Sequence, residues 1–191
     1  MGAFPPPPPP RVTPMAEPVR PRGDPPEEAP FSLAQIMHLM RVEFGRAQRY
    51  RYPLSCLLIA VDRLGHLRDL YGYEAKEEIL AEVVSLLEAQ SRGCDFLGRL
   101  MDDRLLAVVP HTGAEGARVL GERLVAGARR LRFVSDDREL GVTLSVGAST
   151  TERGEPLFFD SLLAAAEGAL EEASAAGGDR LSMRDAGAPA G

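Results

Sequence analysis

The feature of this sequence that most constrains its fold is a nearly continuous apolar run from Leu54 to Val61. Short apolar runs of this kind are typical of a strand that is buried in a sheet. The run is far too short to cross a bilayer, which takes about 20 apolar residues in a helix. Because Pro53 directly precedes it and ends a helical pattern, the run predicts a buried strand that follows a helix.

Patterns on both sides of this run predict further elements in a definite order. A capping box of Ser32 and Gln35 predicts the start of an N-terminal helix that runs toward Tyr50. After the apolar run, the spacing of apolar residues predicts a long helical region interrupted near Gly72. The remaining predicted elements are two strands around a tight turn at 96–100 and 105–109, a helix at 114–131, a strand at 142–146, a helix at 161–176 and an edge strand at 181–183. This order predicts an α/β (α+β) fold with a ferredoxin-like β-α-β-β-α-β core.

Composition argues against several classes of protein. The net charge of −6 argues against a general binder of nucleic acid or of anionic membranes. The two cysteines, Cys56 and Cys94, form neither a disulfide framework nor a paired-cysteine metal site, which favours a reducing compartment. The N-terminus lacks the basic and apolar regions of a signal peptide, so we expect a cytoplasmic protein that does not enter a membrane.

The first 30 residues differ in composition from the rest of the chain, because they hold 12 of its 16 prolines. Such a segment lacks backbone donors and large apolar groups, so we expect a disordered arm. The alternative is that the arm docks in an SH3-like groove of a protein partner. The sequence thus divides into an arm at 1–30, a domain at 31–184 and a flexible tail at 185–191.

Several local patterns follow one another in order and at suitable spacing. They are the entry into the first predicted strand at 46–62, a Tyr-Gly turn at 69–73, the segment leading into the predicted hairpin at 95–100, the strand leaving it at 105–110, a Val-Thr-Leu-Ser-Val-Gly strand at 142–147 and the last helix and strand at 166–180. Together they resemble segments of the GGDEF (diguanylate cyclase-like) domain family. The resemblance covers residues 40–183 and implies a ferredoxin-like core of the GGDEF/nucleotide cyclase type.

The positions that carry the family's catalytic chemistry depart from its pattern. The resemblance implies two metal ions held by two carboxylates, of which the first falls on Ala60 and the second on Asp103. An alanine methyl cannot bind a cation, and Asp62, the nearest other carboxylate, lies two residues along the same strand face. The other departures are Met101 and Asp102 for the two glycines, Arg104 for an acidic residue, Arg68 for Asn and Glu77 for Asp at the guanine, and Ser174 for a phosphate-facing Lys. We therefore predict a catalytically inactive domain that is not an enzyme and holds no metal or cofactor.

One site of the family is retained. Arg92 and Asp95 form the Arg-x-x-Asp pattern of the family's inhibitory site, separated from the signature by five residues, and Arg123 falls at the position of a further site arginine. Arginine forks and a carboxylate can bind guanine edges and phosphates. The resemblance therefore predicts a cyclic di-GMP receptor at these three residues, with retention by descent alone as the rival explanation.

Two other functions remain as alternatives. The first is a weak diguanylate cyclase that makes cyclic di-GMP from GTP, with Asp62 and Asp103 as its metal ligands. The second is a ligand-free scaffold that keeps only the fold and its dimer surface. With each of these functions, the chain can form a homodimer or bind a protein partner through the Pro-rich arm, and the sequence does not choose between them.

Overall fold

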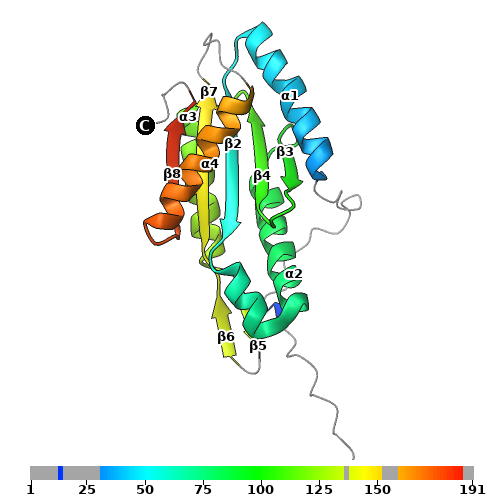
Figure 1. Cartoon of the computed structure of the whole chain (residues 1–191), viewed down its shortest axis with the longest axis vertical. Helices are drawn as coiled ribbons and strands as arrows, with labels where there is room; N and C mark the ends of the chain where they lie inside the picture. Colours follow the sequence, from blue (N-terminus) through cyan, green and yellow to red (C-terminus); the bar gives the residue numbers. More distant parts are fainter. Residues whose placement is uncertain (1–12, 15–30, 136–137, 152–158, 187–191) are drawn as a thin grey trace, which may run out of the picture.

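The computed structural model describes residues 13–14, 31–135, 138–151 and 159–186 (Figure 1). Its centre is a five-stranded sheet of order β3-β4-β2-β7-β8. These strands are β2 (Leu54–Val61), β3 (Phe96–Arg99), β4 (Leu105–Pro110), β7 (Leu144–Thr151) and β8 (Arg180–Asp185). Neighbouring strands are antiparallel except β7 and β8, which run parallel. The predicted α/β fold with a ferredoxin-like core is thus confirmed, with β2 as the central strand.

Helices cover both faces of this sheet, which explains why the central strand is apolar throughout (Figure 1). On one face, Leu57 and Ile59 of β2 pack in a core with α2 and α3. On the other, Cys56 and Leu58 pack in a second core with α1 and α4. The helices are α1 (Leu33–Tyr50), α2 (Leu64–Gln90), α3 (Ala114–Ala128) and α4 (Phe159–Ala175). Since side chains alternate along a strand, burial on both faces requires an uninterrupted apolar run.

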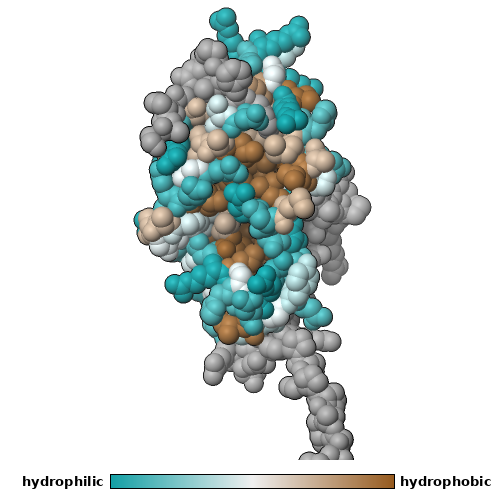
Figure 2. Space-filling view, in the orientation of Figure 1, coloured by the Kyte–Doolittle hydropathy of each residue, from teal (hydrophilic) through white to brown (hydrophobic). Residues whose placement is uncertain are grey.

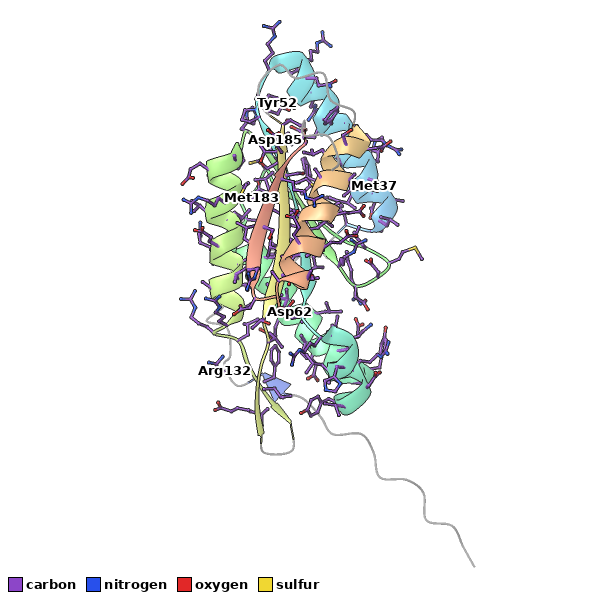
Figure 3. All side chains as sticks on the ribbon, turned by 60° about the vertical axis from the view of Figure 1, so that its left-hand side comes forward. Met37, Tyr52, Asp62, Arg132, Met183 and Asp185 are labelled. Atoms are coloured by element: carbon purple, nitrogen blue, oxygen red, sulfur yellow. The ribbon has the colours of Figure 1, made fainter. Side chains whose placement is uncertain are left out.

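The outer surface of the α1 and α4 layer is partly apolar in the view of Figure 2, where apolar residues show between these two helices. Partly buried apolar side chains of this layer include Met37, Ala60, Leu100 and Leu163. Figure 3 shows α3 and α4 on either side of the sheet, with Asp62 at the end where β2 runs out. Within the described residues, no helix has both the length and the apolar character needed to cross a bilayer.

A second, smaller sheet was not predicted. It consists of β1 (Thr13–Pro14), β5 (Arg132–Ser135) and β6 (Arg138–Gly141), in the order β1-β5-β6. The predicted helix at 114–131 therefore ends at Ala128, and the strand predicted at 142–146 begins at Leu144. The segment from β5 to β6 is rich in charged residues and has no clear alternation, yet Phe133 anchors it because its side chain is completely buried.

The predicted disordered arm differs from the structure at two residues. Thr13 and Pro14 pair in antiparallel register with Val134 and Phe133 of β5. The rest of the arm, residues 1–12 and 15–30, lies outside the described residues. At the other end of the chain, β8 extends through Asp185, one residue past the predicted end of the domain, and residues 187–191 also lie outside.

Candidate functional site

The turn between β3 and β4 carries the residues that replace the family signature. The N–H of Leu100 donates to the carbonyl of Arg104 at 2.8 Å, and the N–H of Asp103 donates to the carbonyl of Leu100 at 3.3 Å. Asp103 has φ of 66°, a left-handed conformation that aspartate tolerates better than most residues. Met101 at the tip is 89% exposed. The turn therefore directs Asp103 back toward the domain and leaves Met101 in solvent.

Four charged side chains form a closed cluster beside this turn, which we call the α2–hairpin ion cluster: Lys76 and Glu77 from α2, Arg99 from β3, and Asp103. Lys76 Nζ lies 2.7 Å from Asp103 Oδ2 and 3.3 Å from Glu77 Oε1. Arg99 donates to both oxygens of Glu77, at 2.8 and 2.9 Å, and to Asp103 Oδ1 at 2.5 Å. Its two positive and two negative charges neutralise each other.

The ion pairs shift the ionisation of the cluster. Hydrogen bonds from Arg99 lower the pKa of Glu77 to about 2, against an ordinary value of 4.5. The pKa of Asp103 is also lowered: burial opposes ionisation, but the hydrogen bonds from Lys76 and Arg99 outweigh it. The hydrogen bond to Asp103 raises the pKa of Lys76. All four groups are therefore charged at neutral pH, because each carboxylate is stabilised by the two cations and each cation by a carboxylate.

Ala60 lies on the sheet face covered by α4, and the side chain of Arg104 crosses the same face. The β2–β4 register pairs Ile59 with Leu105, which places Arg104 beside Ala60. Arg104 Nη2 lies 3.5 Å from Glu167 of α4, and its Nε donates to Asp102 at 2.6 Å. A guanidinium therefore lies near the position where the family resemblance places a metal-binding carboxylate.

Asp62, the alternative metal ligand, accepts hydrogen bonds from three groups in two other segments. Its Oδ2 accepts from the hydroxyl of Thr143 at 2.6 Å and from the N–H of Asp179 at 2.9 Å, and its Oδ1 accepts from the hydroxyl of Ser145 at 2.6 Å. The backbone at Gly178 approaches so closely that a Cβ there would lie 2.7 Å from the carboxylate. Asp62 thus ties the end of β2 to β7 and to the loop before β8.

These residues do not fit the two-metal arrangement that the family resemblance implies. Both oxygens of Asp103 accept from cationic groups, and Ala60 has no ligand atom. Among the described residues, no group of three or more histidine, cysteine, aspartate or glutamate side chains could hold a metal ion.

Sequence reasoning missed a hollow of about 270 Å³ at the start of α2. Its lining includes Arg63, His66 and Gly177, together with Asp62 and Thr143. The first N–H groups of a helix are unpaired within the helix and favour anions, and Arg63 and His66 add basic side chains to that end. The sequence could have indicated this hollow, because a helix that starts directly after a buried strand has its N-terminus at the end of that strand.

Of the other predicted positions, Arg68 forms an exposed pair with Asp69, and Ser174 is exposed near the end of α4.

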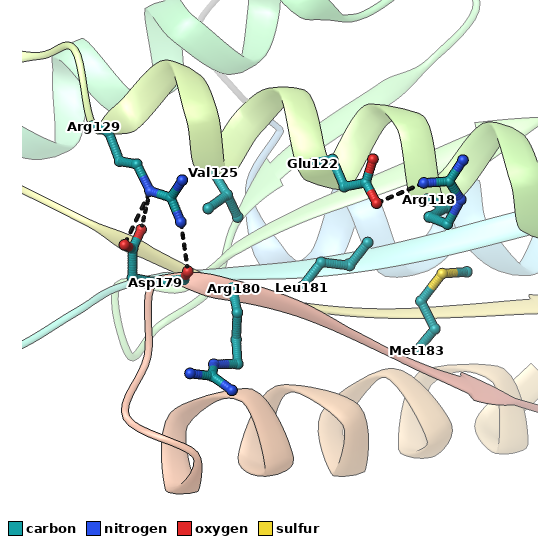
Figure 4. A pocket seen from close by; sticks show the side chains of 8 residues that line it. All are labelled: Arg118, Glu122, Val125, Arg129, Asp179, Arg180, Leu181 and Met183. Atoms are coloured by element: carbon teal, nitrogen blue, oxygen red, sulfur yellow. Dashed lines mark hydrogen bonds and ion pairs between the residues drawn. The ribbon is translucent and has the colours of Figure 1, made fainter.

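A larger hollow of about 430 Å³ lies between α3 and β8 (Figure 4). The charged side chains on its rim are paired: Arg129 with Asp179, and Arg118 with Glu122. Val125 and Leu181 contribute apolar surface. This hollow contains none of the predicted site residues.

The structure brings Arg92 and Asp95 together at the turn that leads into β3. The backbone N–H of Arg92 donates to Asp95 Oδ2 at 2.8 Å, and the N–H of Asp95 donates to the carbonyl of Arg92 at 2.9 Å. Arg123 lies on α3, one helical turn before Gly127, which packs so tightly against Leu86 of α2 that a Cβ would lie 2.7 Å from it. Arg123 itself is exposed on α3, and α2 ends at Gln90, two residues before Arg92.

The fold and these positions define a known class of domain. Residues 34–180 match the family model described as "Diguanylate cyclase, GGDEF domain", and the chain belongs to this family. The chain is 26% identical over 135 residues to Diguanylate cyclase A of Treponema denticola, which covers 68% of this chain and 35% of that relative. It spans about a fifth to a third of the length of the curated relatives that it matches, with 35%, 22% and 35% for three of them.

Solved structures share this fold. The diguanylate cyclase SiaD of Pseudomonas aeruginosa, in complex with its activator SiaC, matches with a TM-score of 0.74 and 25% identity, over 80% of this chain and 58% of that one. The GGDEF domain of DgcB from Caulobacter crescentus, in complex with c-di-GMP, matches with a TM-score of 0.76 and 14% identity, over 88% of this chain and all of that one, 100%. The second likeness shows the fold alone.

The prediction that this chain is not an enzyme is contradicted by these findings. The family model is that of a diguanylate cyclase domain, and the relative from Treponema denticola is named a diguanylate cyclase. The prediction counted departures at Ala60 and at residues 101–104 as losses. A missing side chain shows which contact is absent, but it does not show which neighbouring groups act in its place.

Proposed function

We propose that this chain is a signalling domain that binds cyclic di-GMP through Arg92, Asp95 and Arg123. The observation that carries the proposal is that the side chains of Arg92 and Arg123 have no partner among the described residues. Within the described residues, the guanidinium groups of Arg92 and Arg123 form no hydrogen bond or ion pair. Both side chains are exposed: Arg123 lies on α3, and Arg92 lies two residues past the end of α2, the helix against which α3 packs. A ligand that binds these two guanidinium groups would therefore break no contact among the described residues.

The chemistry of the three side chains suits this ligand. A guanidinium presents a planar fork that can pair with the edge of guanine or with a phosphate. The carboxylate of Asp95 can accept from guanine N–H groups. Two arginines offset the two phosphate charges of a cyclic dinucleotide. The GGDEF domain of DgcB, which shares the fold, was solved in complex with c-di-GMP.

The test is a calorimetric titration of the purified chain with cyclic di-GMP, and Arg92→Ala is the sharpest variant. Arg92 contributes only backbone groups to the turn with Asp95, so the substitution removes the guanidinium and keeps the turn. Loss of a charged bidentate contact should weaken binding by roughly 10- to 150-fold, or about 1.5–3 kcal/mol. Arg123→Ala should weaken binding in the same direction.

Arg104→Ala is the matched control, because it removes a half-buried arginine that pairs with Asp102 and Glu167 at the far end of β3. It should leave the affinity for cyclic di-GMP unchanged. If the unmodified chain shows no heat of binding at high micromolar ligand, the receptor proposal fails and Arg92 and Asp95 are a relic of descent.

Synthesis of cyclic di-GMP from GTP is a second candidate, favoured by the family model and by the name of the relative from Treponema denticola. The hollow at the start of α2 could take phosphate groups, since Arg63 and His66 line it beside a helix N-terminus. A turnover assay with GTP tests this candidate, with Asp103→Asn as the variant that should abolish product formation. Product in both proteins at equal rates would exclude a role for Asp103. The cytoplasmic location, the partner of the Pro-rich arm and a homodimer stay predictions.

A further inference from the structure

Lys76 is the only lysine among the 22 lysine and arginine residues of this chain. A lone lysine in a chain that otherwise uses arginine marks a position where the two cations are not interchangeable. Its side chain is only 9% exposed, which is unusual for a charged residue. The ring of Tyr73 covers it on one side, with Nζ 4.5 Å from the ring centroid.

The contacts of Lys76 and Arg99 account for every carboxylate oxygen of the ion cluster. Lys76 contacts Asp103 Oδ2 and Glu77 Oε1, at 2.7 and 3.3 Å. Arg99 contacts Asp103 Oδ1 and both oxygens of Glu77. The two carboxylates therefore share two cations, and none of their four oxygens is without a positively charged neighbour.

The shape of the cation explains the choice of lysine at this position. An ammonium is a compact point charge with three donors, whereas a guanidinium is a flat fork that needs two acceptors in its own plane. Lys76 approaches oxygens of two different carboxylates from a buried position, as a small spherical cation would. Divalent metal ions also prefer oxygen ligands, and they bind them at shorter distances than these.

We propose that Lys76 is an internal cation that occupies the carboxylates of Glu77 and Asp103 and excludes a divalent metal ion from them. A metal ion approaching Asp103 must displace the ammonium from Oδ2 and the guanidinium from Oδ1. Because the side chain of Lys76 is buried, its ammonium has little room to withdraw. It therefore stays close to the incoming metal ion and repels it. The proposal does not depend on cyclic di-GMP binding, since Arg92 and Asp95 precede β3 while the cluster lies at its other end.

The first test is the affinity of the full chain for Mn²⁺, measured by electron paramagnetic resonance of the free ion. Lys76→Met removes the charge and keeps an unbranched side chain. It should raise the affinity for Mn²⁺ by roughly tenfold or more, because two carboxylates then share only one cation. Adding Asp103→Asn to Lys76→Met should remove the gain. Equal affinity of the unmodified chain and Lys76→Met, including no binding by either, overturns the proposal.

The second test uses only the unmodified chain, so it is independent of how the variants fold. An amine-directed acetylating reagent can modify one side chain here, and mass spectrometry of the peptide that contains Lys76 reports its rate. Acetylation of Lys76 should be slow, because the amine is buried in the ion cluster, and millimolar Mn²⁺ should leave the acetylation rate unchanged. A rate that rises on addition of Mn²⁺ would show that the metal enters the cluster and displaces Lys76, which contradicts the proposal.

Discussion

Asp62 shows how a single carboxylate can hold distant segments of this domain in place. Its two oxygens accept from Thr143, Ser145 and the backbone of Asp179. Replacing it with asparagine leaves one oxygen as an acceptor and turns an amide N–H₂ toward groups that also donate.

We expect Asp62→Asn to lower the free energy of unfolding by about 2–4 kcal/mol, since charged hydrogen bonds are lost and donors are left unpaired. In a chain of this size, that corresponds to a fall in Tm of roughly 4–16 °C. Thermal unfolding followed by circular dichroism measures it, with the exposed Asp69→Asn as control. If Asp62→Asn has the same Tm as the unmodified protein, the hydrogen bonds to Asp62 do not stabilise the fold.

The sequence placed Asp62 near Ala60 but could not supply its partners. Thr143 and Ser145 lie 81 and 83 residues away along the chain, and Asp179 lies 117 residues away. The same limit applies to the ion cluster, because Lys76 and Asp103 are 27 residues apart and meet only when α2 packs beside the hairpin. Arg92 and Asp95, in contrast, are local in sequence, so the backbone N–H of Arg92 and the carboxylate of Asp95 meet within one turn.

Glu77 makes the stability of the domain depend on pH in the acid range. Its pKa is about 2 in the folded chain, below the ordinary value of 4.5, so its ionised form favours folding. This stability is complete above the ordinary pKa and is lost as the pH falls from about 4.5 toward 2. The side chain is 34% exposed, so solvent screening reduces the contribution to about 1–2 kcal/mol.

Glu77→Gln should therefore be less stable than the unmodified chain above pH 5 and should approach its stability near pH 2. Urea unfolding at a series of pH values measures the difference between the two proteins. Glu74→Gln, an exposed position on the same helix, should show no such convergence. A difference for Glu77→Gln that is independent of pH would contradict the lowered pKa.

Among the elements, β7 and α4 are packed so closely that their contact depends on one glycine. A Cβ at Gly147 would lie 2.2 Å from the backbone nitrogen of Leu170 and 2.3 Å from the carbonyl oxygen of Ala166. Backbone atoms cannot move aside as a flexible side chain can, so α4 would have to shift from the sheet.

We expect Gly147→Ala to cost about 3 kcal/mol or more in the free energy of unfolding. Gly45→Ala is the matched control: it lies inside α1 with open space around a Cβ, and it should stabilise the domain by about 0.5–1 kcal/mol. Chemical unfolding of both variants measures whether each substitution lowers or raises the free energy of unfolding. If both substitutions stabilise the chain, the β7–α4 contact is looser than its geometry indicates.

Element prediction from the sequence succeeded where burial dictates a pattern. The strand predicted at Leu54 to Val61 is β2, residue for residue, because both of its faces are covered. The capping box of Ser32 and Gln35 is also present at the start of α1. The hairpin of β5 and β6 was missed, because it pairs mainly with itself and its charged residues carry no alternating pattern. Its apolar residues Phe133, Val134 and Leu140 are not spaced in alternation.

At the scale of the whole molecule, the two groups of candidate residues lie at opposite ends of β3. Arg92 and Asp95 precede the strand, and the turn with Asp103 follows it. The sheet between them is buried under two layers of helices, so substitutions in one group should leave the other intact. This separation is what allows Arg104→Ala to serve as a control for Arg92→Ala.

Among the described residues, two connections tie the segment before α1 to the rest of the domain, and they differ in strength. Thr13 and Pro14 form a two-residue strand against β5, in which proline has no N–H to donate. Phe31 makes a stronger connection: its N–H donates to the carbonyl of Leu97 at 2.8 Å, and its carbonyl accepts from the N–H of Arg99 at 3.1 Å.

We therefore expect a chain that starts at Pro30 to melt within about 2 °C of the full chain, because the two-residue strand contributes little. A chain that starts at Leu33 also loses the Phe31 bonds and the capping box at Ser32, worth about 2–3 kcal/mol together. It should melt roughly 4–12 °C lower. Differential scanning calorimetry of the three chains separates the contributions. If the Pro30 chain instead melts as low as the Leu33 chain, residues before Phe31 dock on the domain and stabilise it, and the arm is part of the folded unit.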